Sequence, residues 1–291
     1  MLCCLFAVPY RYIGMTCSAQ LLWEISGNGV KEKSYIFATY PLADISFLDS
    51  VPHIFKIYSD CEKIISEVNV PDNEAIRAIM SGAKLEEGKT LKDIYSPIQY
   101  DRISNAFRSA FFKSKLSIER LSYLKPAYLT TLYRDELLSV WLNYDPNRSL
   151  QTFFQNVAVE QMKPVVALDD IGEAIYMMFN REPQEWQEKE LINIVEYPDR
   201  ELDLEKELIK QYKKGNLEEM VIAVKRPDNL ATINYSDYKV FATRNRTWVK
   251  RLKPYLKEGK VLICVNALFL GGDEGLLALL KAEGYKVKKY M

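Results

Sequence analysis

The 291-residue chain has a single histidine, His53. One histidine excludes an HExxH zinc motif and any metal centre built on a histidine pair. A Ser-His-Asp triad would have to use His53, and the sequence has no GxSxG turn to present a serine. No Walker A or GxGxxG loop occurs, and Gly271–Gly272 alone indicates a turn rather than an anion site. A lone histidine in a predicted helix is more often structural than a ligand.

Net charge is also absent, because 39 Lys and Arg residues balance 39 Asp and Glu residues. There is therefore no electrostatic case for binding nucleic acid or an anionic membrane surface. The five cysteines form no CxxC pair, which excludes a zinc ribbon or a thioredoxin-type site. Cys61 and Cys264, the two that lie beyond the first twenty residues, have apolar neighbours and are predicted to be buried free thiols.

The first twenty residues are similar to an export signal. Residues 1–15 are apolar, and Cys17–Ser18–Ala19 supplies the small residues that a signal peptidase requires. Arg11 leaves the apolar run too short for a membrane span, and no positive charge precedes it. We expect a cleaved signal and export to the periplasm or cell envelope, with lipidation of Cys17 as an alternative. If the segment is only an N-terminal extension, the protein would be cytoplasmic.

Apolar periodicity predicts strands at both ends of the chain and one near the middle, with helices between them. The expected strands are 21–25, 34–39, 63–68, 164–168, 261–265 and one that starts at 285. The expected helices are 48–61, 74–81, 98–112, 126–141, 149–161, 171–179, 185–195, 199–213, 216–224, 235–242 and 245–256. This order predicts an α/β (α+β) fold in one domain, residues 21–291. The two ends and a middle strand would form a central mixed sheet, covered by a long helical excursion.

The C-terminal stretch, residues 261–290, has the pattern strand, turn, helix, strand. Gly271–Gly272 permits a tight turn, and Asp273 is expected to be the N-cap of the helix that follows. Gly284 ends that helix. Lysines at 286, 288 and 289 are typical of charges that protect the edge of a sheet.

Carboxylates at strand ends are the candidate functional groups. Glu67 ends one apolar strand and Asp169 another, and such side chains can converge in a crevice. Arg244–Asn245–Arg246 is expected to open a helix, and either arginine could hold a carboxylate. Alternatively, the carboxylates cap the adjoining helices or hold loops, and the arginines are surface charge.

Several segments in a fixed order resemble one known family. They are Leu22–Ile25 with Ser34–Phe37, Cys61–Val68, Lys163–Asp169, Arg244–Arg246 and Leu270–Val287. Together they resemble the TraB/GumN family, which is related to the Tiki proteases and more distantly to the erythromycin-esterase and ChaN-like proteins. The resemblance covers nearly all of residues 21–287. It implies the scaffold of a hydrolase that depends on a divalent metal.

Two motifs of that family are altered here. The family carries two Gly-x-x-His motifs, whose histidines contribute to its metal site. Ala38 and Pro41 replace the glycine and histidine of the first motif, and Asn266 and Phe269 replace those of the second. Proline and phenylalanine side chains have no lone pair to offer a metal. An acidic residue often found before the middle strand is Gln151. The resemblance therefore implies that the metal, and with it any cofactor, has been lost.

Three functions follow from this comparison. The leading hypothesis is an exported pseudoenzyme, a binding or regulatory module in which Tyr40 and Arg246, with Glu67 and Arg244, hold a peptide or small ligand. The alternative is an active peptidase or esterase in which Glu67 and Asp169 form a general acid/base pair and Arg244 stabilises an oxyanion. The third is a structural envelope protein. An open pocket lined by the two carboxylates and Arg244 would favour the first two, and a packed crevice the third.

Overall fold

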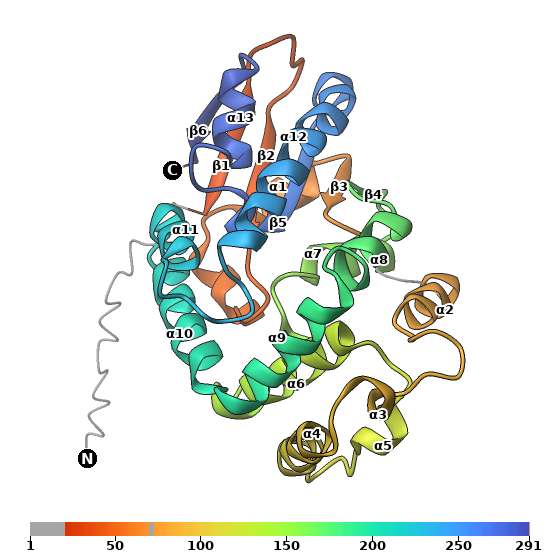
Figure 1. Cartoon of the computed structure of the whole chain (residues 1–291). Coiled ribbons are helices and arrows are strands. Elements are labelled where there is room, and N and C mark those ends of the chain that lie inside the picture. The colour runs from red at the N-terminus through yellow and green to blue at the C-terminus, as the bar shows by residue number, and fades with distance from the viewer. Residues whose placement is uncertain (1–20, 70–72, 291) are drawn as a thin grey trace, which may run out of the picture.

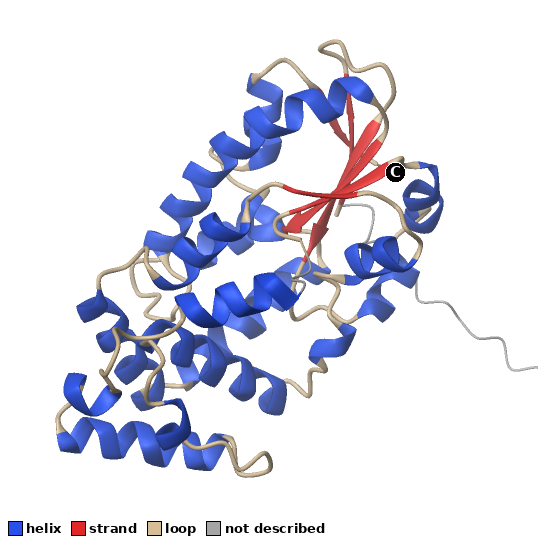
Figure 2. Ribbon diagram, turned by 90° about the vertical axis from the view of Figure 1, so that its right-hand side faces the viewer, coloured by secondary structure: helices blue, strands red, loops and turns tan. Residues whose placement is uncertain are grey.

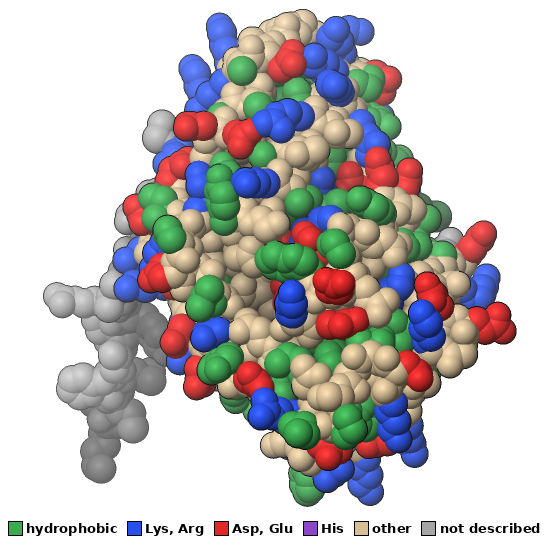
Figure 3. Space-filling view, in the orientation of Figure 1, with side chains coloured by type: hydrophobic (Ala, Val, Ile, Leu, Met, Phe, Trp, Pro, Cys, Tyr) green, Lys and Arg blue, Asp and Glu red, His purple; other side chains and the backbone are tan. Residues whose placement is uncertain are grey.

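A computed structural model describes residues 21–69 and 73–290 of the chain. The expected signal segment, residues 1–20 with Cys17, lies outside these described residues. Within the two described ranges, no helix is long and apolar enough to span a membrane. One sheet occupies the upper part of the molecule in Figure 1 and helices fill the lower part. Positive and negative side chains are intermixed over the surface seen in Figure 3.

The sheet joins both ends of the chain to its middle. Its described strands have the order β4-β3-β5-β2-β1-β6. Strands β2, β5, β3 and β4 are parallel, whereas β1 is antiparallel to both of its neighbours. The strands are β1 (Leu22–Ser26), β2 (Ser34–Thr39), β3 (Lys63–Ser66), β4 (Val165–Ala167), β5 (Val261–Asn266) and β6 (Lys286–Lys289). This topology confirms the predicted mixed sheet and the α/β fold class.

The two central strands explain why the sequence shows continuous apolar runs rather than alternation. Every residue of β2 is buried, and so are the first five residues of β5. A parallel strand that is covered on both faces needs apolar side chains in both directions. The register pairs Tyr35 with Leu262 and Thr39 with Asn266. The carboxyl ends of β2 and β5 therefore lie next to each other.

The final strand forms one edge of the sheet. β6 pairs with β1 and has no other neighbour in the described strand order. Its three lysines are exposed while Val287 points into the core. The predicted edge charges are thus confirmed, and they oppose pairing with a strand from another molecule.

Helices cover the sheet on both sides and continue into a separate helical part (Figure 2). Beside the sheet lie α1 (Ile54–Asp60), α7 (Phe153–Glu160), α10 (Asp199–Lys213), α11 (Leu217–Lys225), α12 (Tyr235–Glu258) and α13 (Leu276–Ala282). Farther away lie α2 (Asn73–Gly82), α3 (Leu91–Ile94), α4 (Pro97–Ala110), α5 (Ile118–Leu121), α6 (Pro126–Trp141), α8 (Ile171–Phe179) and α9 (Gln184–Glu196). The first group packs its apolar residues with the sheet. Helices α3 to α6, α8 and α9 bury a second apolar cluster of their own.

The predicted helix over residues 48–61 is wrong, because it is broken in the middle. A 3₁₀ helix, Ile45–Ser50, ends first, and α1 starts at Ile54. Between them Val51 is extended, as the residue before a proline prefers to be. His53 has a φ of 60° just before α1, so it lies outside the helix that was expected to contain it.

Two further expectations about helix boundaries are wrong. The predicted helices 235–242 and 245–256 form one continuous helix, α12, so Arg244–Arg246 lies in its middle instead of opening it. At the C-terminus, Gly275 precedes α13 in place of the expected N-cap Asp273. A Cβ on Gly275 would come within 2.3 Å of the carbonyl oxygens of Leu270 and Gly271, so this close turn requires glycine.

The two cysteines in the described residues, Cys61 and Cys264, are buried free thiols, as predicted. Burial raises the pKa of the Cys61 thiol to about 12 and raises that of Cys264 as well. Both thiols therefore stay protonated at neutral pH and act as small apolar groups in the core.

Candidate functional site

The carboxyl ends of the four parallel strands bring together residues that are far apart in the sequence. Tyr40 follows β2, Asn266 ends β5, Glu67 follows β3, and Asp169 lies two residues after β4. The segments after β3 and β4 stay together because the amide of Asp169 donates to the carbonyl of Glu67 at 2.9 Å. The two predicted carboxylates thus converge at one edge, where ligand sites of parallel sheets are usually found.

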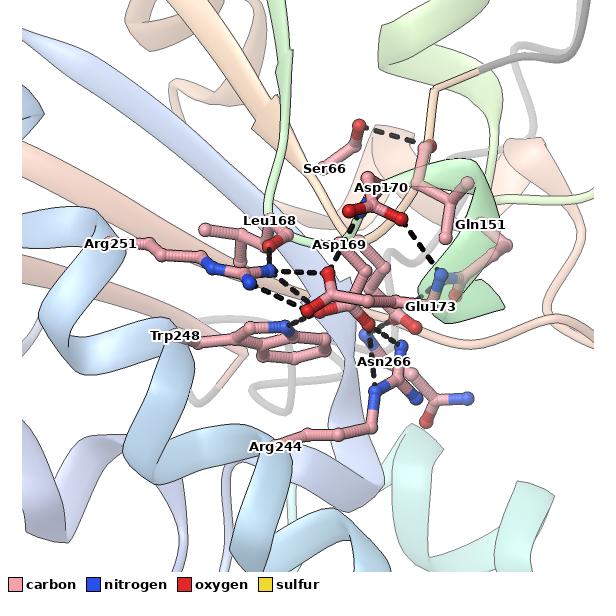
Figure 4. Close-up of polar contacts among 12 residues, drawn as sticks. Ser66, Gln151, Leu168, Asp169, Asp170, Glu173, Arg244, Trp248, Arg251 and Asn266 are labelled. Atoms are coloured by element: carbon pink, nitrogen blue, oxygen red, sulfur yellow. Dashed lines mark hydrogen bonds and ion pairs between the residues drawn. The ribbon is translucent and has the colours of Figure 1, made fainter. Parts of the chain in front are cut away.

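Asp169 is held by donors from one face of α12 (Figure 4). Arg244 donates through Nε and Nη2 to its Oδ2, at 2.9 and 2.5 Å. Trp248 Nε1 donates to Oδ1 at 2.5 Å, and Arg251 reaches the same oxygen at 3.4 Å. Since Asp169 is only 5% exposed, these donors replace the water that its charge would otherwise need.

Glu67 is held by different partners. Its Oε1 accepts from the backbone amide of Asn266 at 2.7 Å and from Nε2 of Gln151 at 2.8 Å. Gln151 in turn accepts from the hydroxyl of Thr39 at 2.7 Å. Burial raises the pKa of the Glu67 carboxyl, while the charge of Arg244 and the two hydrogen bonds oppose that rise. The side-chain amide of Gln151 therefore donates to the same Glu67 oxygen as the backbone amide of Asn266 at the end of β5.

Phe269, which the resemblance sets at the second histidine position, is part of an aromatic cluster. Its ring centroid lies 4.6 Å from those of both Phe241 and Trp248. The guanidinium of Arg244 lies 4.7 Å from the Trp248 ring and 4.8 Å from the Phe269 ring. The phenylalanine therefore packs against the arginine that holds Asp169, and it is 3% exposed.

Tyr40, next to the first altered position, is also buried. Its ring stacks on that of Tyr212 with centroids 5.4 Å apart, and its hydroxyl donates to Glu205. Burial raises the pKa of Tyr40 well above 10, so the hydroxyl stays protonated and remains a donor. The hydroxyl of Tyr212 donates to the carbonyl of Ala38 at 2.9 Å, which fixes the end of β2.

The structure does not bring every predicted residue to the site. Arg246 projects to the surface and pairs with Glu274. The residue between the two arginines, Asn245, is buried and donates to the carbonyls of Phe269 and Glu274, so it ties α12 to the loop after β5. His53 packs against Tyr290, the residue after β6, and contacts none of the candidate residues.

Cavities surround the carboxyl edge of the sheet. One of about 700 Å³ runs along β4 and is lined by Asp169 and Arg251. Another of about 550 Å³ is lined by Glu67 and Gln151. A third of about 300 Å³ is lined by Tyr40, with Pro41 and Asn266. Glu67 and Asp169 therefore face different cavities, although their backbones are adjacent.

Trp248 and Arg251 were not predicted, although the sequence contains a signal for them. They lie four and seven residues after Arg244, which places all three on one face of a helix. Reading 244–256 as the continuation of a helix would have grouped them. The donor role of Gln151 had no comparable signal, because its partner Glu67 lies 84 residues away.

The comparison with known families decides what this scaffold is. The model of the TraB/PrgY/gumN family matches residues 21–289. The chain belongs to this family. No curated protein and no solved structure gave a significant match. The resemblance inferred from the sequence is therefore confirmed, and it spans both the sheet and the helical part.

The residues at the site do not fit the divalent metal that the TraB/PrgY/gumN resemblance implies. Pro41 and Phe269, which the resemblance sets at the two histidine positions, supply no donor atom. Asp169 is paired with arginine and tryptophan, and Glu67 with an amide and a backbone N–H. Within residues 21–69 and 73–290, no three His, Cys, Asp or Glu side chains are grouped to hold an ion.

The buried ion pair between Asp169 and Arg244 of α12 should contribute far more to the free energy of unfolding than the exposed pair between Glu274 and Arg246 of the same helix. Asp169→Asn leaves the arginine without its counter-charge, and we expect a loss of about 3 kcal/mol in the free energy of unfolding. Glu274→Gln, which breaks the exposed pair with Arg246, should cost less than about 1 kcal/mol. Urea unfolding of both variants measures the difference, and equal losses would contradict this account of Asp169.

The raised pKa of Glu67 gives a pH dependence with a definite sign. The protonated carboxyl is favoured in the folded state, so its contribution is complete below the ordinary pKa of 4.5. The contribution is lost as the pH rises through the higher folded value. Wild type should therefore lose stability relative to Glu67→Gln as the pH rises above 4.5. The exposed Glu87→Gln is the control, and a parallel pH profile of wild type and Glu67→Gln would contradict the shift.

Proposed function

We propose that this member of the TraB/PrgY/gumN family is a non-catalytic module that binds a peptide or small molecule at the carboxyl edge of its sheet. The observation that carries the proposal is the pairing of Asp169. Both of its oxygens are engaged by Arg244 and Trp248. A general base needs a free lone pair within reach of the substrate. Here that lone pair already serves the fold.

The arginine is committed in the same way. Arg244 uses Nε and Nη2 for a single carboxylate oxygen, and the face of its guanidinium lies near the rings of Trp248 and Phe269. An oxyanion stabiliser must aim free donors at the reacting atom. Arg244 would have to leave Asp169 to do so, which would strand a buried charge. Asp169 and Arg244 therefore act as a fixed support for the strand ends.

The three cavities at this edge separate Glu67 from Asp169, and Arg244 lines none of them, so the described residues do not form the expected shared pocket and binding is left to the separate cavities. The cavities beside Glu67 and Tyr40, of about 550 and 300 Å³, have the size of small-molecule sites. Their walls mix apolar side chains with many polar and charged ones, which can fix the orientation of a ligand by hydrogen bonds. Because Asp169 and Arg244 are paired with each other, the strand ends can form the walls of a binding cavity without a catalytic group in it.

The second candidate is the hydrolase in which Glu67 serves as the general acid. One observation favours it: the pKa of this carboxyl is raised by burial, which is the state that a general acid requires. Under this hypothesis Glu67→Gln removes the proton donor and leaves the shape of the site intact.

One experiment separates the two candidates. Metal content is measured by elemental mass spectrometry after incubation with manganese, cobalt or zinc, and hydrolysis of labelled casein and p-nitrophenyl acetate is followed for wild type and Glu67→Gln. We expect metal content near zero and equal hydrolysis by both proteins. One tightly held ion per chain, or turnover that disappears in a folded Glu67→Gln variant, would overturn the non-catalytic proposal.

Export is part of the same proposal and has its own test. The apolar residues 1–15 and the small residues at 17–19 support a cleaved signal. We expect the intact mass of the chain recovered from producing cells to lack about twenty N-terminal residues. Recovery of the full mass from the cytoplasm would refute export.

A further inference from the structure

A second group of charges lies next to the candidate site, between α6 and α10. Arg134 on α6 donates to both Glu201 and Glu205 on α10. The hydroxyl of Tyr40 donates to the second oxygen of Glu205. The backbone amide and the hydroxyl of Thr232 donate to the two oxygens of Glu201. Two carboxylates that are 2% and 1% exposed therefore share a single arginine.

This arrangement leaves an excess of negative charge inside the protein. A buried carboxylate without a counter-charge is costly even when its hydrogen bonds are complete. The charge of Arg134 can balance only one of the two. The remaining negative charge creates a field that favours a cation in any space next to Glu205.

Such a space exists. The cavity of about 300 Å³ described above opens onto Glu205 and Arg134. Its wall also carries Asp135, Glu136 and the ring of Tyr144. Three carboxylates thus face one guanidinium across a pocket that also contains aromatic rings. An anionic ligand would be repelled there, whereas a cation would be attracted by the carboxylates and by the ring faces.

We propose that this cavity binds a guanidinium group on an alkyl stem, carried either by a free small molecule or by an arginine side chain of a peptide. A guanidinium presents paired N–H donors that match carboxylate oxygens, and its flat face stacks on tyrosine. The stem would lie along Pro41 and Leu42, at the end of β2. This inference rests on the proposed binding function and names the chemistry of its ligand.

The test is isothermal titration calorimetry of the full chain with a matched pair of probes. N-acetyl-arginine amide carries the guanidinium, and N-acetyl-citrulline amide has the same shape without the charge. We expect the arginine probe to bind at least about tenfold more tightly. Agmatine separates the two sources: affinity equal to that of the arginine probe supports a free small molecule, and weaker binding supports a peptide. Equal binding of the arginine and citrulline probes overturns the proposal.

Variants locate the binding within the molecule. Glu136→Gln removes a charge from the cavity wall without touching the buried Arg134 network, whereas Asp135 pairs with Arg134 at 3.7 Å and is left unchanged. Glu136→Gln should weaken the binding of the arginine probe about tenfold while the melting temperature stays the same. Glu87→Gln removes an equal charge from a distant surface and should leave the affinity unchanged. An equal loss of affinity in Glu87→Gln, or no loss in Glu136→Gln, overturns the assignment. Calorimetry requires no turnover, so discovery of hydrolysis would refute the non-catalytic function and leave this site in place.

Discussion

The carboxylate of Asp169 is the group on which the arrangement of this sheet edge depends. A charge removed from water must be compensated by fixed donors, and the donors of Asp169 come from a single helix face. Satisfying it positions α12 against the end of β4. In that position of α12, the guanidinium of Arg244 lies near the rings of Trp248 and Phe269. Asn245 of the same helix donates to the carbonyl of Phe269 and so holds the loop after β5. One ion pair therefore coordinates strands from the middle and the end of the chain, as satisfied buried polar networks do.

Much of the fold could be predicted because buried parallel strands leave continuous apolar runs, as β2 and β5 do. The bounds of α6, α8 and α10 also follow from their periodicity and match the structure. The errors arose where distant contacts override local pattern. Nothing local shows that Asn245 is buried, because its partners Phe269 and Glu274 lie 24 and 29 residues away. Pro52, by contrast, was a local signal for the break before α1.

The candidate site could be predicted only in part. Glu67 and Asp169 were identified because the ends of neighbouring parallel strands must lie at one edge. Their partners could not be identified, since a hydrogen-bond partner on another helix depends on how that helix packs. The same limit applies to Glu201 and Glu205. Their helix is rich in Glu and Lys, which is typical of a solvated face, yet both side chains are buried around Arg134. The family and its fold can thus be predicted from the sequence. The hydrogen-bond partners of the buried charges cannot, because they depend on how the helices pack.

The strand order has a consequence for how the chain matures. β5 lies between β2 and β3, and β6 completes the edge beside β1, so the sheet lacks its central strand until the last thirty or so residues exist. During synthesis the N-terminal hairpin and β3 cannot reach their final neighbours, and the apolar core beside them stays open to water. The sheet therefore cannot be complete before β5 and β6 have been synthesised. Until then the apolar residues of β2 and β3 lack the strand that pairs with both, and they form the kind of exposed surface that chaperones bind.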